Sequence, residues 1–189
     1  LPIGKGSSGF KAAALGGWNI NGIVTRSSGP PFTVSQGTTA TTTALLGGSR
    51  RPDLVAGRSK DDILSGTTAG CPGFAAGQEL GTADRFFDPC AFSFAAPTGW
   101  GNLGRNTLRS PGFFNVDFSL NKDWKIPAVS ESFQVQFRGE MYNIFNHPNL
   151  GIPSGSIANG SNTPSTSAGQ ISGTLNSSRQ IQLGIKAVF

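Results

Sequence analysis

The chain has 189 residues, of which 37% are hydrophobic and 13% charged, and its formal net charge is +5. It contains no run of about 18 or more apolar residues, which excludes a membrane-spanning helix. Its basic residues are not interleaved with aromatic residues in a compact motif, so the sequence gives no support for nucleic-acid binding.

The first predicted strand covers residues 16–26, where Trp18, Ile20 and Val24 would lie on the outward face. It ends at Ser27-Ser28-Gly29-Pro30-Pro31, because two prolines remove two donors from a strand ladder. Residues 32–110 then lose sustained alternation and become rich in Gly, Ser, Thr, Ala and Pro, which predicts a long loop. Such a loop is unusual in a compact soluble domain but common on the outer side of a membrane barrel.

Three further strands, near residues 112–124, 132–145 and 179–189, share one design in which every second residue is apolar. A short turn at residues 127–131 joins the first two into a hairpin, and a second low-complexity loop covers residues 146–178. The apolar positions are Phe114, Val116, Phe118, Leu120; Phe133, Val135, Phe137, Met141; and Ile181, Leu183, Ile185, Phe189.

Strand length and the polar face favour a membrane barrel over a soluble β-domain. The strands reach roughly the 9 to 11 residues needed to cross a bilayer at a tilt. Their polar faces carry Asn, Gln, Asp, Arg, Glu and Tyr, and aromatic residues lie near the strand ends, as in barrel interface girdles. We therefore predict an all-β fold, an antiparallel transmembrane β-barrel segment of about four long strands with two long outer loops. A soluble β-domain is the alternative.

Several motifs carry a resemblance to a known family. They are Gly17-Trp18-Asn19-Ile20-Asn21-Gly22-Ile23-Val24, Ser28-Gly29-Pro30-Pro31-Phe32, Phe87-Asp88-Pro89-Cys90-Ala91-Phe92, Gly101-Asn102-Leu103-Gly104-Arg105-Asn106, Arg109-Ser110-Pro111-Gly112-Phe113-Phe114-Asn115-Val116-Asp117 and Phe137-Arg138-Gly139-Glu140-Met141-Tyr142-Asn143-Ile144-Phe145-Asn146-His147-Pro148. Together they resemble the C-terminal end of TonB-dependent outer-membrane receptors of Gram-negative bacteria, and specifically the Oar-like group with a carboxypeptidase-regulatory-like N-terminal domain.

The resemblance implies a transporter that binds a scarce solute outside the cell and imports it with energy from the inner membrane. The implied partners are outer-membrane lipid, the inner-membrane TonB energy-coupling complex acting through a missing N-terminal part, and the barrel-assembly machinery, which would read Phe189 as a C-terminal assembly signal. Phe189 would lie on the periplasmic side, so both long loops would lie outside. No cofactor is implied, and the solute stays open among metal chelates, oligosaccharides and peptides.

Four strands cannot close a barrel, so the predicted segment is incomplete on its own. Open strand edges are costly in lipid because each unpaired backbone group loses its hydrogen bond. Leu1-Pro2-Ile3-Gly4 resembles no signal peptide, and we expect these residues to belong to a longer polypeptide. The alternative is self-association, in which copies pair edge to edge into an extracellular tube or fibre.

The two cysteines, Cys71 and Cys90, both lie in the first predicted loop. An even count outside the reducing cytosol favours a disulfide. Free thiols or a metal pair are the alternatives, although no histidine or second thiol pair lies near enough in sequence to complete a zinc set.

Charged and polar residues on the inward faces of the strands form the other candidate site, a lumen ladder of Asp117, Asn121, Arg138, Glu140 and Lys186. Opposite charges across neighbouring strands would stiffen the barrel, and contact with a plug domain or a permeating solute is the functional alternative. His147, the single histidine, is expected to bond to loop backbone through its imidazole. No nucleophile elbow accompanies it, so we expect no enzyme.

Overall fold

The computed structural model describes residues 2–3, 16–37, 49–96, 99–159 and 163–189. The chain divides into two compact units, which are described separately below. Unit 1 comprises Leu1–Ser27, Phe113–Asn149 and Asn176–Phe189, and unit 2 comprises Ser28–Gly112 and Leu150–Leu175.

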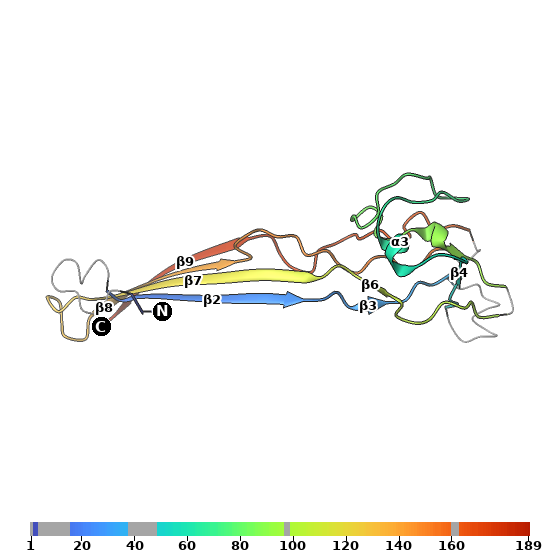
Figure 1. The fold of residues 1–189 in the computed structure, drawn as a ribbon. Helices are drawn as coiled ribbons and strands as arrows, with labels where there is room; N and C mark the ends of the chain where they lie inside the picture. Colours follow the sequence, from blue (N-terminus) through green and yellow to red (C-terminus); the bar gives the residue numbers. More distant parts are fainter. Residues whose placement is uncertain (1, 4–15, 38–48, 97–98, 160–162) are drawn as a thin grey trace. The chain divides into compact units, whose positions relative to one another are not determined.

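Unit 1 is one antiparallel sheet with the strand order β1-β2-β7-β8-β9. β1 is the two-residue Pro2–Ile3, and four long strands follow it side by side (Figure 1): β2 Trp18–Ser27, β7 Phe113–Lys125, β8 Gln134–Tyr142 and β9 Gln180–Val188. The all-β antiparallel fold is therefore confirmed, and the sheet is not closed into a barrel.

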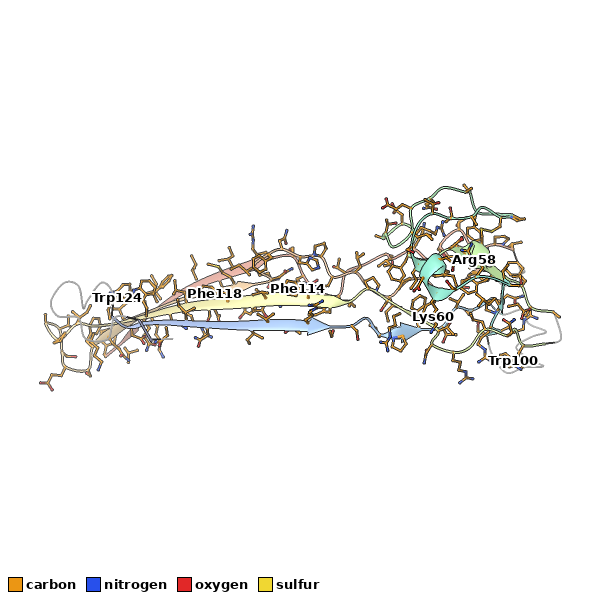
Figure 2. The ribbon with its side chains drawn as sticks, in the orientation of Figure 1. Arg58, Lys60, Trp100, Phe114, Phe118 and Trp124 are labelled. Carbon is orange, nitrogen blue, oxygen red and sulfur yellow. A yellow bond between two sulfur atoms is a disulfide. The ribbon has the colours of Figure 1, made fainter. Side chains whose placement is uncertain are left out.

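The register gives this sheet one polar and one apolar face. Directly opposed residues in an antiparallel pair point to the same side. Ile20 opposes Leu120, which opposes Gly139, which opposes Leu183. Figure 2 shows side chains leaving the strands on both sides, with Phe114, Phe118 and Trp124 labelled along β7. The apolar positions of all four strands therefore fall into one face.

The hairpin between β7 and β8 closes as its sequence predicts. The Ile126 amide donates to the Phe133 carbonyl at 3.0 Å, beyond the last ladder pair of Lys125 and Gln134. The Val129 amide then donates to the Ile126 carbonyl at 3.0 Å within the turn. At its other end β8 stops at Tyr142, short of the expected residue 145, because Asn143 adopts a φ of 51° that no strand continues.

Unit 2 corrects the expectation that residues 32–110 and 146–178 are simple loops. It contains two short ladders, β3 Pro31–Phe32 with β6 Leu108–Arg109 and β4 Asp53–Leu54 with β5 Phe92–Ser93. It also contains the helix α3 Lys60–Leu64 and the 3-10 turn η1 Pro89–Ala91.

A hydrophobic core holds unit 2 together, and it comprises Phe32, Val34, Ile63, Phe87, Ala91, Phe92, Leu103, Leu108, Ile157 and Ala168. Both segments of unit 2 contribute to this core. Phe87 packs edge-to-face on Phe92 with ring centroids 5.9 Å apart. The core residues are spaced too irregularly to show a period, which is why the sequence gives no sign of them.

Among the described residues, the apolar face of unit 1 has no comparable hydrophobic cover. Every residue of the buried hydrophobic cluster lies in unit 2. Val24, Leu183 and Ile185 are 69%, 71% and 79% exposed. A soluble sheet buries such a face against a second layer, so this arrangement favours lipid as its neighbour. In the described part of the chain, no helix is both long and apolar enough to span a membrane.

Candidate functional site

The polar face of unit 1 brings together most of the residues expected in the lumen ladder. Asn121 lies opposite Arg138 between β7 and β8, and Lys186 lies opposite Gln136 between β8 and β9. Glu140 opposes Ser119 on one side and Gln182 on the other. One continuous polar surface therefore crosses three strands.

The charges on this surface pair along a strand rather than across strands as expected. Arg138 donates to Glu140 at 2.6 Å, and the two side chains, 66% and 20% exposed, are two residues apart on β8. Asp117 instead accepts hydrogen bonds from the Asn115 side chain at 2.8 Å and the Asn143 amide at 2.9 Å. Because directly opposed positions hold Asn, Ser and Gln, the nearest opposite charge is the neighbour on the same face of the same strand.

Three asparagines tie the ends of β7, β8 and β9 together. The Asn149 side chain accepts from the Phe114 amide at 2.7 Å and donates to the Phe114 carbonyl at 2.8 Å, so it substitutes for a strand neighbour. Asn143 accepts from the His147 amide at 2.9 Å and donates to the Ser177 carbonyl at 3.1 Å. Asn146 accepts from the Arg179 amide at 2.9 Å, next to the start of β9.

Two of these three positions need residues that tolerate a left-handed backbone. Asn143 and Asn146 both have a φ of 51°, a region that asparagine enters more readily than other non-glycine residues. Asparagine also carries both a donor and an acceptor for the orphaned backbone groups at a strand end. The motif from Tyr142 to Asn149 is therefore a strand-terminating structure, a role that its resemblance to a family motif did not reveal.

A polar hollow of about 220 Å³ lies beside these strand ends. Its walls include Asn115, Asp117, Tyr142 and Gln180. A second hollow of about 240 Å³ shares Asp117 and Tyr142 and continues along the polar face past Glu140. The Asn115 side-chain oxygen is buried and has no hydrogen-bond partner within the described chain. Because this oxygen is not accessible, the groups of the polar face that a solute or another domain could reach are the exposed ones, such as the Arg138–Glu140 pair.

His147 lies at the strand end, as expected, but its imidazole does not make the expected kind of contact. The ring packs edge-to-face on Phe114 with centroids 5.8 Å apart. The bonds to neighbouring loop residues are made by its backbone, whose carbonyl accepts from Asn143 and Asn176 at 3.2 and 3.4 Å.

Lys122 is a feature that the sequence reasoning missed. It occupies the apolar register after Phe118 and Leu120 and is fully buried. Its ammonium lies 5.2 Å from the ring centroids of both Trp18 and Trp124 and donates to the Gly16 carbonyl. Part of the signal was available: Lys122 stands at an apolar position two residues before Trp124, and a lysine beside an aromatic ring is typical of cation–π packing and of a long side chain reaching an interface. The contact with Trp18 depends on the register of β2 and β7.

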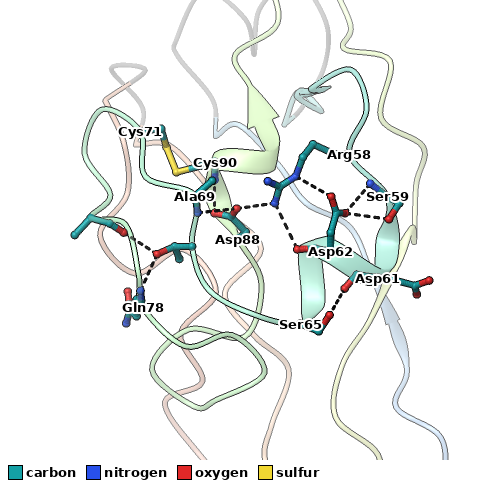
Figure 3. A network of polar contacts seen from close by, with 12 residues as sticks. Arg58, Ser59, Asp61, Asp62, Ser65, Ala69, Cys71, Gln78, Asp88 and Cys90 are labelled. Carbon is teal, nitrogen blue, oxygen red and sulfur yellow. Dashed lines mark hydrogen bonds and ion pairs between the residues drawn. A yellow bond between two sulfur atoms is a disulfide. The ribbon is translucent and has the colours of Figure 1, made fainter.

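In unit 2 the disulfide between Cys71 and Cys90 is confirmed, with Cα atoms 5.6 Å apart. It adjoins the network in Figure 3 that centres on Asp88, a carboxylate with no exposed surface. Asp88 accepts from Arg58 at 2.6 Å, from the Cys90 amide at 3.0 Å and from the Ala69 amide at 3.2 Å. A buried carboxylate is stable only with such partners, so the network fixes both ends of the disulfide loop.

The charges of unit 2 are less solvated than loop charges usually are. Arg58 also contacts Asp62 at 3.3 Å, and the pKa of Asp62 is lowered chiefly because its carboxylate accepts the Ser59 amide hydrogen. Arg50 is 1% exposed and donates to the Ala96 carbonyl at 2.5 Å. Burial lowers the pKa of Arg85, whose guanidinium lies over the Phe74 ring at 5.4 Å. These charged side chains therefore hold the loops of unit 2 together.

Within the described residues, no group of three or more His, Cys, Asp or Glu side chains is arranged to hold a metal ion.

Comparison with known proteins gives one result. Residues 1–182 match the family model described as an outer membrane beta barrel domain. No curated protein and no solved structure matches the chain.

Proposed function

Since this chain belongs to the outer membrane beta-barrel domain family, we propose that it forms part of the wall and outer surface of a TonB-dependent transporter. The membership makes it an outer-membrane protein. The transporter would bind a scarce solute outside the cell and import it with energy supplied from the inner membrane. It would transport the solute unchanged, without an enzymatic step.

The observation that carries the proposal is the division of the sheet into two faces over strands of 9 to 13 residues. The exposed apolar face suits lipid, and the polar face suits a wet interior. A large receptor barrel holds a plug domain inside it. The partly exposed Arg138–Glu140 pair offers that plug, or a passing solute, both charges.

The finer assignment to the TonB-dependent receptors of the Oar-like group rests on the motif resemblance. The asparagine-rich segment that ends β8 is one of those motifs, and its side chains bond to backbone at the start of β7 and just before the start of β9. A motif whose side chains bond to strand-end backbone has a structural role in the barrel. It supports a shared barrel and leaves the identity of the solute open.

The proposed partners follow from the same arrangement. Phe189 is 87% exposed, with its ring 5.2 Å from that of Phe133, so the terminal aromatic is available to the barrel-assembly machinery. The TonB energy-coupling complex would act through the N-terminal part of a longer receptor. Lipid would contact the apolar face.

Solute depletion tests the proposal. Cells with and without the gene, each in the presence and absence of TonB, would be grown in a complex medium whose small molecules are followed by mass spectrometry. We expect at least one solute to disappear only when both proteins are present. Depletion that does not require TonB, or no difference between the four strains, would contradict the proposal.

Self-assembly into an extracellular tube is a second candidate, and the open edge of β9 is the observation that favours it. β9 pairs only with β8 in the described chain, and its backbone can therefore accept another strand. The intact mass of the native polypeptide in an outer-membrane extract separates the candidates. A mass several times that of these 189 residues supports the transporter, and a mass equal to theirs supports self-assembly.

A further inference from the structure

Unit 2 contains an apolar pocket of about 470 Å³ that the polar network and the core do not fill. This volume lies within the range of small-molecule sites and is far too small for a protein domain. Its apolar lining includes Phe74, Phe92, Phe94, Val55 and Ile157. Ser93 supplies a hydroxyl, and the described lining has no Asp, Glu, Lys, Arg or His.

The pocket is built from segments that are fixed before any ligand arrives. Cys71 and Phe74 exchange two backbone hydrogen bonds of 3.0 and 2.8 Å, and the disulfide joins this turn to Cys90, which also lines the pocket. Pro72, Pro89 and Pro164 also line it, and each has a locked φ. A rigid wall lowers the entropy cost of binding.

Two of the rings that line the pocket are also held in place by contacts with neighbouring side chains. Arg85 lies 5.4 Å from the centroid of Phe74, and Arg85 is itself fixed by the Gln78 side chain at 3.0 Å and by the Ala168 carbonyl. The Phe92 ring packs edge-to-face on the buried Phe87. Phe94 and Val55, in contrast, are 39% and 37% exposed and leave the pocket open to solvent.

We propose that this pocket binds a small, uncharged aromatic or alicyclic molecule. The aromatic wall offers ring stacking and apolar burial, whereas a charged ligand would lose its hydration with no opposite charge to replace it. The single hydroxyl of Ser93 can orient one polar substituent. The inference deepens the proposed function, on which it rests for the claim that this molecule is the transported solute.

The test uses the purified native protein and a neutral photoreactive probe, trifluoromethyl-phenyldiazirine, with labelled peptides quantified by mass spectrometry. Labelling of the peptide that carries Phe94 is expressed relative to that of the lipid-facing β9 peptide, which corrects for probe dissolved in detergent. We expect naphthalene to compete for the Phe94 peptide and naphthalenesulfonate not to compete. Equal competition by the two compounds would overturn the assignment to uncharged ligands.

Two variants make the site itself falsifiable. Ser93→Trp places an indole in the pocket and should reduce the relative labelling by about tenfold, the order expected for losing burial of one ring. Ser172→Trp, at an exposed position of unit 2 outside the lining, should leave it unchanged. Phe94→Ala provides a second, smaller perturbation of the pocket. Protease resistance equal to that of the wild type shows that each variant folds. Wild-type labelling in both Ser93→Trp and Phe94→Ala would refute the pocket.

The two proposals fail separately. If naphthalene competes for the Phe94 peptide but solute depletion does not require TonB, the proposed transport is refuted and the binding site stands. TonB-dependent depletion without saturable labelling of the Phe94 peptide would refute the binding site alone. A phenylalanine-containing tripeptide that competes better than naphthalene would overturn the small-molecule class in favour of a peptide.

Discussion

Removing the Asp88 carboxylate should destabilise unit 2 far more than removing Asp62, although both carboxylates contact Arg58. The Asp88 side chain is fully buried and accepts three hydrogen bonds, whereas the Asp62 side chain is 46% exposed. Breaking a buried, hydrogen-bonded pair typically costs about 3–5 kcal/mol. The Arg58 side chain keeps 21% exposure, so water can partly replace its partner, and we expect the lower end, about 3 kcal/mol, for Asp88→Ala.

Pulse proteolysis of the purified native protein in urea measures this difference, with the cleavage sites mapped to residues 51–112. A loss of about 3 kcal/mol raises the population of the cleavable form on the order of 100-fold. Asp62→Ala is the matched control, because it removes the same group from the same arginine at an exposed site. Asp88→Asn, which retains one acceptor, should fall between the two. Equal protection of Asp88→Ala and Asp62→Ala would refute the argument from burial.

Three further predictions concern other contacts. Replacing both Cys71 and Cys90 by alanine should lower the stability of unit 2 by about 3 kcal/mol in the same proteolysis assay, and unchanged protection would contradict a stabilising role of the disulfide. Lys122→Ala should destabilise the sheet by roughly 2 kcal/mol because the cation–π contacts are lost, and heat-dependent gel mobility measures this change. Lys122→Arg should restore the stability of the sheet. Equal mobility of Lys122→Ala and wild type would contradict the contact. Because the folded pKa of Asp62 lies below its ordinary 3.8, its support of α3 is complete above that pH and is lost as the pH falls through the lowered value. The protection of the amides at residues 60–64, measured as their exchange rate relative to the intrinsic rate at each pH, should therefore fall in acid for wild type and show no such step in Asp62→Asn.

The sheet could be predicted from the sequence because strict alternation encodes which face each residue occupies. The polar positions Asn121, Arg138 and Glu140 follow from that period alone. The direction of the charge pairing does not, because it depends on which residues the register places opposite one another. The alternating pattern places Lys122 on the apolar face, but only the structure shows that its ammonium lies between two tryptophans.

Unit 2 could not be predicted in the same way. Its core combines residues as distant as Phe32 and Ile157, and no local period connects them. The cysteines were the one local sign of an ordered region, and they led to the disulfide but not to the packed core or the apolar pocket beside it. Most of the described glycines and prolines in this unit lie in loops, as expected, although Pro31 lies in β3 and Pro89 in η1. They do not exclude that such loops pack together.

Site-specific labelling in intact cells tests the orientation that the family resemblance implies, with residues 32–110 outside the outer membrane and the β7–β8 turn in the periplasm. Ser65→Cys in unit 2 and Val129→Cys in the turn are both exposed, and each would be treated with a membrane-impermeant maleimide. The account predicts labelling of Ser65→Cys in intact cells and of Val129→Cys only after the outer membrane is permeabilised. Labelling of Val129→Cys in intact cells, with Ser65→Cys protected, would contradict it.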